Sequence, residues 1–137
     1  MLKRDFIMVQ IEELGKALAR LVFNRKSGKD LDKNPDLIEQ AFTALKTDSA
    51  FLLGHSPEEI EQALNQDDGC GLQRLELAAK LLIEDSYVSS LPFPLLNKAQ
   101  ELLYYLQIHD STYSVERMML LQEVEHELSR PTVCCGS

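Results

Sequence analysis

Tryptophan is absent from the 137 residues, and only five prolines and six glycines interrupt the chain. Long stretches without these breakers favour helices over short strands joined by tight turns. No apolar run approaches the roughly 18 residues that a membrane-spanning helix needs, which argues against a membrane protein. The apolar run near the start, at residues 6–9, is too short for the core of a secretion signal. We therefore expect a cytoplasmic protein.

Cysteine is also scarce, with Cys70 in the middle of the chain and an adjacent pair, Cys134 and Cys135, near its end. An odd count without a C-x-x-C spacing fits a reducing compartment and supplies no four-ligand zinc site. The ending "CCGS" departs from a prenylation box, because its middle positions are Cys135 and Gly136 and not aliphatic residues. We predict one helical domain over residues 1–130 and a loose tail over residues 131–137. Whether the tail cysteines have a redox role is left open.

Charge is unevenly distributed along the chain. The formal net charge is −8, yet residues 1–33 hold eight Lys or Arg against five Asp or Glu, and residues 34–137 hold six against seventeen. A predominantly acidic body argues against nucleic-acid binding, which needs a basic face to neutralise phosphates. The basic cluster at residues 20–33, which includes Arg25, is predicted to be a solvated helix end and loop.

The first predicted helix spans residues 3–24 and carries an apolar seam. Its members recur with alternating spacings of four and three residues, which is typical of a helix that packs nearly parallel or antiparallel to a partner. The seam consists of Ile7, Ile11, Leu14, Leu18 and Leu21. An antiparallel neighbour inside the domain is the favoured partner, with the stripe Leu121, Val124 and Leu128 as its complement. The alternative is a homodimer through this first helix.

Start signals predict the next two helices. Asn34 followed by Pro35 predicts an N-cap and a helix to about residue 45, and Ser49 restarts a short turn. Ser56 and Glu59 have the spacing of a capping box, which opens a short helix.

The second half of the chain predicts three longer helices, at residues 72–89, 94–110 and 114–129. The first of these is apolar on two faces, so we expect neighbours on both sides and place it at the centre of the fold. No alternating run predicts a strand. The predicted fold is therefore all-α: five or six helices in antiparallel hairpins, forming a stacked array or an irregular bundle.

This order of helices resembles a family of uncharacterised bacterial all-helical proteins with tetratricopeptide-like helix pairs. The resemblance lies in three stretches, "IEELGKALARLVFNRKSGK", "LIEQAFTALKTDSAFLLGHSPEEIEQAL" and "LELAAKLLIEDSYVSSLPFPLLNKAQELLYYL". It implies a fold of stacked helical hairpins and no known activity.

Candidate chemistry is sparse. Cys70 at a helix start could have a lowered thiol pKa, with His55 as its base, but the two lie on either side of a predicted helix. The Glu-x-x-His step from Glu123 to His126 lacks the second copy that a di-iron bundle needs. No phosphate loop, nucleophile elbow or dinucleotide fingerprint is present. A thiol or metal enzyme therefore ranks last, and we predict no enzyme activity, no cofactor and no metal.

The leading functional hypothesis is a non-catalytic module that binds an unknown protein or peptide. Tyr104 and Ile108 lie one turn apart, opposite the leucine face of their predicted helix, as in helical repeats that hold peptides. The alternative for these two residues is that another helix covers them. The alternative for the whole chain is a self-assembling, homodimeric structural protein.

Overall fold

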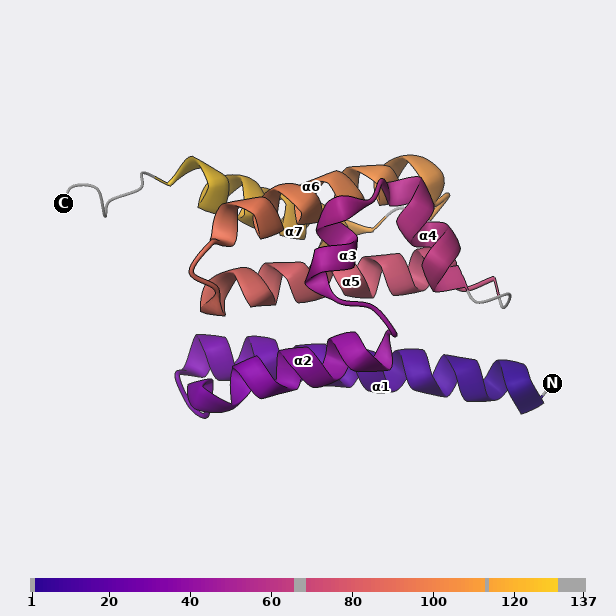
Figure 1. Ribbon diagram of the computed structural model, residues 1–137, viewed down its shortest axis with the longest axis horizontal. Coiled ribbons are helices and arrows are strands. Elements are labelled where there is room, and N and C mark those ends of the chain that lie inside the picture. Colours follow the sequence, from indigo (N-terminus) through magenta and orange to yellow (C-terminus); the bar gives the residue numbers. More distant parts are fainter. Residues whose placement is uncertain (1, 66–68, 113, 131–137) are drawn as a thin grey trace.

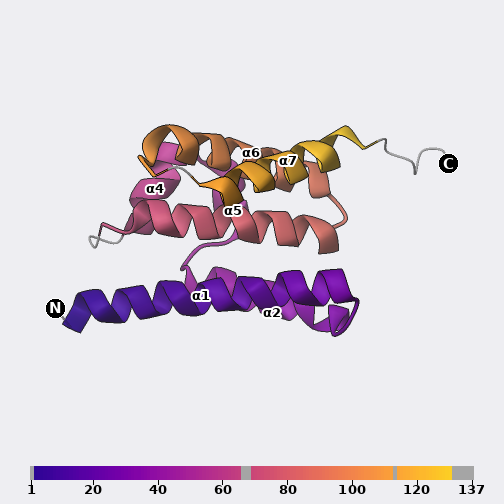
Figure 2. The same ribbon diagram turned by 180° about the vertical axis from the view of Figure 1, so that it is seen from behind.

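The computed structural model describes the backbone of residues 2–65, 69–112 and 114–130, and the side chains of this part from residue 9 onward. All regular structure in these ranges is helical, as predicted, and an N-terminal hairpin lies along one side of a cluster of five helices (Figures 1 and 2). The hairpin consists of α1 (Leu2–Ser27) and α2 (Asn34–Ala44). The cluster consists of α3 (Ser49–Gly54), α4 (Pro57–Asn65), α5 (Gly71–Val88), α6 (Pro92–His109) and α7 (Val115–Ser129).

The connection between α1 and α2 reverses the chain. Gly28 has a positive φ of 78°, and its N–H donates to the carbonyl of Asn24, which ends α1 in the left-handed conformation that glycine adopts easily. A short 3₁₀ helix (Leu31–Lys33) leads into α2.

The predicted N-cap role of Asn34 is wrong. Its side chain is buried, accepts from Asn24 Nδ2 at 3.0 Å and donates to the carbonyl of Leu21 at 3.3 Å, so it joins the two helices.

Two caps begin the next helices. The carboxylate of Asp48 accepts the N–H of Phe51 at 2.8 Å and starts α3, which raises the count in the described residues to seven, above the predicted five or six. The predicted capping box is confirmed: Glu59 N–H donates to Ser56 Oγ at 3.2 Å, and Ser56 N–H donates to Glu59 Oε1 at 3.0 Å. The three-residue spacing of Ser56 and Glu59 thus determines where α4 begins.

The start of α5 packs closely against α4. A Cβ atom at Gly71 would lie 2.9 Å from the carbonyl oxygen of Glu61, so only glycine fits this approach without a shift. The buried guanidinium of Arg74 donates to the carbonyl of Leu64 at 2.9 Å. A cation bonded to the last carbonyls of a helix stabilises that end, so α5 caps α4.

Helix α5 is the centre of the fold, as its two apolar faces predict. It contacts α1 and α2 on one side and α4 and α6 on the other. Residues of both predicted faces are buried. Full burial of one leucine side chain stabilises the folded state by about 1.5–3 kcal/mol, so both faces contribute to stability. The buried apolar residues of α5 are Leu75, Leu77, Ala78, Ala79, Leu81, Leu82 and Ile83. Val88, assigned to one apolar face, is instead 42% exposed at the end of the helix.

The seam of α1 is divided along its length. Leu18 and Leu21 are buried within the chain, whereas Ile11 and Leu14 are half-buried, and the side chain of Ile7 lies outside the described part. The helices that pack against α1 are α2 and α5, while α7 packs on α6. The prediction that the α7 stripe complements this seam is therefore wrong, because α5 lies at the position that the stripe was expected to fill.

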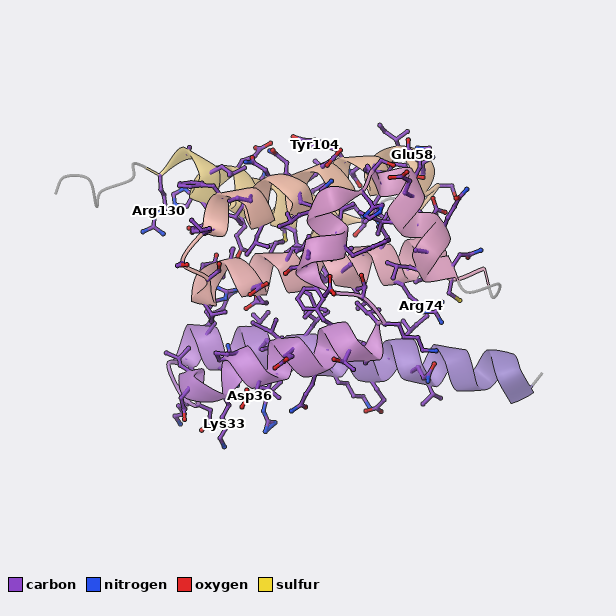
Figure 3. All side chains as sticks on the ribbon, viewed as in Figure 1. Lys33, Asp36, Glu58, Arg74, Tyr104 and Arg130 are labelled. Carbon is purple, nitrogen blue, oxygen red and sulfur yellow. The ribbon has the colours of Figure 1, made fainter. Side chains whose placement is uncertain are left out.

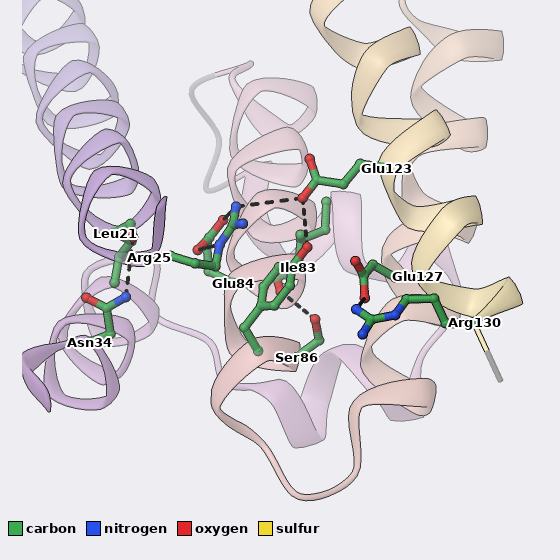
Figure 4. A network of polar contacts seen from close by, with 10 residues as sticks. Leu21, Arg25, Asn34, Ile83, Glu84, Ser86, Glu123, Glu127 and Arg130 are labelled. Atoms are coloured by element: carbon green, nitrogen blue, oxygen red, sulfur yellow. Dashed lines mark hydrogen bonds and ion pairs between the residues drawn. The ribbon is translucent and has the colours of Figure 1, made fainter. Parts of the chain in front are cut away.

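The end of α1 is tied to the helix cluster by a polar network (Figure 4). Arg25 reaches Glu84 of α5 with two hydrogen bonds and lies 3.7 Å from Glu123 of α7. Tyr87 donates its hydroxyl to Glu123, and the Arg25 guanidinium lies 4.1 Å from the centre of the Tyr87 ring. Arg25 is thus a structural contact, and its predicted place in a solvated basic cluster is wrong.

Candidate functional site

Helix α6 divides its side chains between the core and solvent. Its leucines at positions 95, 96, 102, 103 and 106 and its Ala99 are buried, as the predicted leucine face requires. Tyr104 and Ile108 lie on the opposite side and are 45% and 78% exposed. Figure 3 shows Tyr104 pointing away from the helix cluster. No helix of the described chain covers these two residues, which answers the question that the sequence left open.

Helix α7, which packs on α6, carries three exposed apolar side chains. Val115 and Met119 are 60% and 63% exposed, and Met118 lies next to α6, where its sulfur is 2.9 Å from Gln107 Nε2. We call the surface formed by Tyr104, Ile108, Val115, Met118 and Met119 the α6–α7 face. A single large exposed side chain is ordinary, but a group from two adjacent helices marks a candidate binding surface.

Arg117 holds the two helices of this face together. It is 2% exposed, and its guanidinium donates to Gln107 of α6, to Asp110 in the connecting turn and to Glu76 of α5 at 2.9–3.2 Å. The hydroxyl of Ser114 caps α7 by accepting the N–H of Arg117. Hydrogen bonds from the Thr112 N–H and from Arg117 hold the pKa of Asp110 below its usual value. Sequence reasoning missed Arg117, because its partners are up to 41 positions away.

The surroundings of the α6–α7 face are acidic. Five carboxylates on α6 and α7 are exposed or half-exposed: Glu101, Glu116, Glu123, Glu125 and Glu127. Four of them lie within ion-pair distance of a cation: Glu101 of Lys98, Glu116 of Lys80, Glu123 of Arg25 and Glu127 of Arg130. Arg117 is buried in its own ion pairs. Tyr104 donates its hydroxyl to Glu125 at 2.7 Å, and this bond raises the pKa of Tyr104. The two helices that form the face therefore carry more carboxylates than cations, with five glutamates against Lys98 and Arg117.

A second apolar surface lies between α1 and α2. It is an open groove of about 460 Å³. Its apolar lining comes from Val9, Leu14, Ala17, Leu37, Ala41 and Ala44. The groove includes Leu14, the half-buried member of the seam, so the region predicted for a homodimer contact is partly open in the monomer.

A polar hollow of about 550 Å³ lies beside Arg117, between α4, α5 and the α6–α7 turn. Its carboxylates already have partners: Tyr105 donates to Glu61, and Arg117 donates to Glu76 and Asp110. The arrangement is therefore a structural network that orients helices. In the described part of the chain, no group of three or more His, Cys, Asp or Glu could hold a metal ion.

The structure does not bring Cys70 and His55 together as a nucleophile and base. His55 stacks on Phe51 at 4.1 Å and its Nδ1 lies 2.9 Å from the Phe51 carbonyl, at the start of α4. Cys70 precedes α5, beyond the other end of α4. A nine-residue helix is about 13 Å long, whereas proton transfer needs about 3 Å. His126 is exposed and Glu123 bonds Tyr87, while Cys134 and Cys135 lie outside the described residues, as does the predicted tail.

Comparison with known protein families, curated proteins and solved structures finds no match to this chain. The resemblance to a bacterial tetratricopeptide-like family, the bacterial origin and the cytoplasmic location therefore stay predictions. Among the described residues, no helix combines the length and the apolar character that crossing a membrane requires.

Proposed function

We propose that this protein is a non-catalytic interaction module that binds another protein or a peptide on the α6–α7 face. The observation that carries the proposal is the exposure of five large apolar side chains on two adjacent helices. Tyr104 and Ile108, the residues that the sequence pointed to, are part of this group. Large apolar side chains are costly to leave in water, and a group of them on adjacent helices is typical of a binding site.

The anchoring of the face supports the same proposal. Arg117 fixes α7 against α6, so the exposed side chains lie on two rigid helices and lose little backbone freedom when a partner binds. An aromatic residue flanked by aliphatic and methionine side chains is a favourable anchor for a partner. The proposal includes tetratricopeptide-like stacking of the helix pairs, which the antiparallel runs of α1–α2, α5–α6 and α6–α7 support (Figure 1).

Site-specific photo-crosslinking in the native host tests the proposal. A benzophenone side chain at position 108 should give a discrete protein adduct that mass spectrometry identifies, because Ile108 is the most exposed residue of the face. The same group at Phe23, which is 60% exposed on α1, is the matched control. The Tyr104→Ala change should weaken the adduct at position 108. Equal adducts at positions 108 and 23, or none at either, would contradict the proposal.

A second candidate function is self-assembly through α1. The groove beside Leu14 and the half-buried Ile11 favour it, because this end of the seam has no complete partner within the described chain. A homodimer would bury the groove against a second copy of α1. The buried positions Leu18 and Leu21 favour the other reading, in which α1 serves the monomer core.

A further inference from the structure

We infer that the partner of the α6–α7 face is a basic amphipathic helix, with an apolar stripe flanked by Lys or Arg. This inference rests on the proposed function and specifies the kind of partner. It is carried by two independent properties of the face: the shape and chemistry of its apolar side chains, and the sign of the charge around them.

The exposed apolar side chains of the α6–α7 face are suited to binding a partner helix. A third helix can pack against side chains exposed on two antiparallel helices by using its own residues spaced three and four apart. Ile108 and Met119 are the most exposed members of the face, at 78% and 63%. Methionine side chains are flexible and polarizable, so Met118 and Met119 can adapt to apolar side chains of different shape.

The charge determines which helix fits. The carboxylates Glu101 and Glu125 lie on α6 and α7 themselves, with side chains that are exposed. Glu116, in the first turn of α7, is 67% exposed and lies 3.3 Å from Lys80 of α5. The one lysine on the two helices, Lys98, donates to Glu101 and to the carbonyl of His55. The two helices carry five glutamates against the two cations Lys98 and Arg117, so a basic helix would be attracted to them and an acidic helix repelled.

A second copy of the chain is a poorer complement. On α1, Lys16 pairs with Glu13 at 3.5 Å, and the exposed Glu12 offsets the exposed Arg20, so the net charge of that surface is small. Binding of α1 to the α6–α7 face of another copy would also be a heterologous contact, which builds rings or open chains. Self-association is therefore one of the outcomes that the experiment distinguishes.

Three labelled peptides of equal length test the inference with the full-length protein, by fluorescence anisotropy. The first has a leucine stripe at helical spacing and lysine at its polar positions. The second has the same stripe and glutamate at the polar positions. The third has the composition of the first in an order without a stripe. The lysine peptide should bind with saturation, at least about tenfold tighter than either of the others, and its affinity should fall as salt rises.

Two double variants and two controls locate the binding. Tyr104→Ala with Ile108→Ala should weaken binding of the lysine peptide by at least about tenfold, as truncation of anchor residues does. Glu101→Gln with Glu125→Gln should weaken it about three- to tenfold at low salt and little at high salt. The matched controls are Phe23→Ala for the apolar pair and Asp36→Asn with Glu39→Gln for the acidic pair, all at exposed positions. Unchanged thermal melting checks that each variant folds.

Several results would overturn the inference. A glutamate peptide that binds as tightly as the lysine peptide would show that the face has no preference for a basic helix. The proposed function would then still stand, but the inference about the partner's charge would be wrong. Equal binding of the stripe-less peptide would reduce the interaction to charge alone. Absence of saturable binding below about 1 mM, or equal losses in the control variants, would remove the basic-helix partner, and crosslinking at position 108 would then decide the proposed function separately. A wild-type oligomer that the Tyr104→Ala, Ile108→Ala variant converts to monomer would identify a second copy as the occupant.

Discussion

Arg25 of α1 and Glu84 of α5 are joined at two points across 59 positions of sequence. Nε of Arg25 donates to Oε1 at 2.9 Å and Nη2 donates to Oε2 at 2.8 Å. The Glu84 side chain is 5% exposed and that of Arg25 is 18% exposed, so water screens the pair only weakly. A bidentate pair of this kind also fixes orientation, and here it sets the position of the N-terminal hairpin on the central helix.

Replacing Arg25 by Ala should lower the free energy of unfolding by about 3 kcal/mol, because the buried carboxylate of Glu84 loses its charge partner. Urea denaturation measures the change. Lys16→Ala is the control: its ion pair with Glu13 is 75% and 65% exposed, and such pairs contribute less than about 1 kcal/mol. Equal losses in the two variants would show that the Arg25–Glu84 pair does not hold the hairpin.

Ser56→Ala should cost about 1 kcal/mol, the usual contribution of an N-cap hydroxyl. The reason is the loss of the bond from Glu59 N–H to Ser56 Oγ at the start of α4. Thermal or urea denaturation checks it, with Ser90→Ala, an exposed serine between α5 and α6, as the matched control. A Ser56 variant as stable as the Ser90 variant would contradict the observed capping box.

Tyr105 should make stability depend on pH in the alkaline range. Partial burial, together with its hydrogen bond to Glu61, raises the pKa of Tyr105 to about 12, whereas an unfolded tyrosine titrates near pH 10. The folded state therefore holds the proton more tightly. The stabilisation is complete below about pH 10 and is lost as the pH rises towards about 12.

Absorbance of tyrosinate provides the measurement for Tyr105. The difference in tyrosinate absorbance between the wild type and Tyr105→Phe should have its midpoint near pH 12 in the folded protein. The variant should also lose less free energy of unfolding than the wild type between about pH 10 and 12. A difference spectrum with its midpoint near pH 10 would show that Tyr105 is solvated and unbonded.

Substitutions of two leucines of α1 distinguish a role in the monomer core from a role in a dimer contact. Leu21 is fully buried, so Leu21→Ala should cost about 2–5 kcal/mol at any protein concentration. Leu14 is half-buried at the groove, and Leu14→Ala should cost less, about 1 kcal/mol, if the protein is a monomer.

A homodimer through α1 would give a different result. The melting temperature of the wild type would then rise with protein concentration, since association is linked to folding. Leu14→Ala would shift the protein towards monomer in light scattering. A monomeric wild type whose midpoint neither leucine variant changes would contradict both roles of the seam.

The helices themselves were predictable, because breakers, caps and apolar spacing are local signals. The capping box at Ser56 and the leucine face of α6 are found as predicted. Arg25 and Asn34 were misread because their side chains bond atoms of other helices, and a local pattern carries no information about partners 59 or 13 positions away. The division of the α1 seam was hidden for the same reason, since it depends on where α2 and α5 lie.

The candidate site was predictable in part. Tyr104 and Ile108 oppose the leucine face of their own helix, so the sequence suggests their position. The contribution of Met118 and Met119 depends on which side of α7 faces α6, and Arg117 determines that arrangement through Gln107 and Asp110. A buried arginine in an acidic helix resembles a surface residue when only the sequence is read.

The central position of α5 has a consequence for synthesis on the ribosome. The inner side of the α1–α2 hairpin, with Leu21 and Phe42, is covered by α5, which ends 44 positions after α2. At about 5–20 residues per second, these side chains stay exposed for several seconds before their cover is made. A nascent chain that stalls before α5 is made would present this apolar face without its cover, and chaperones that bind such surfaces would bind the α1–α2 hairpin.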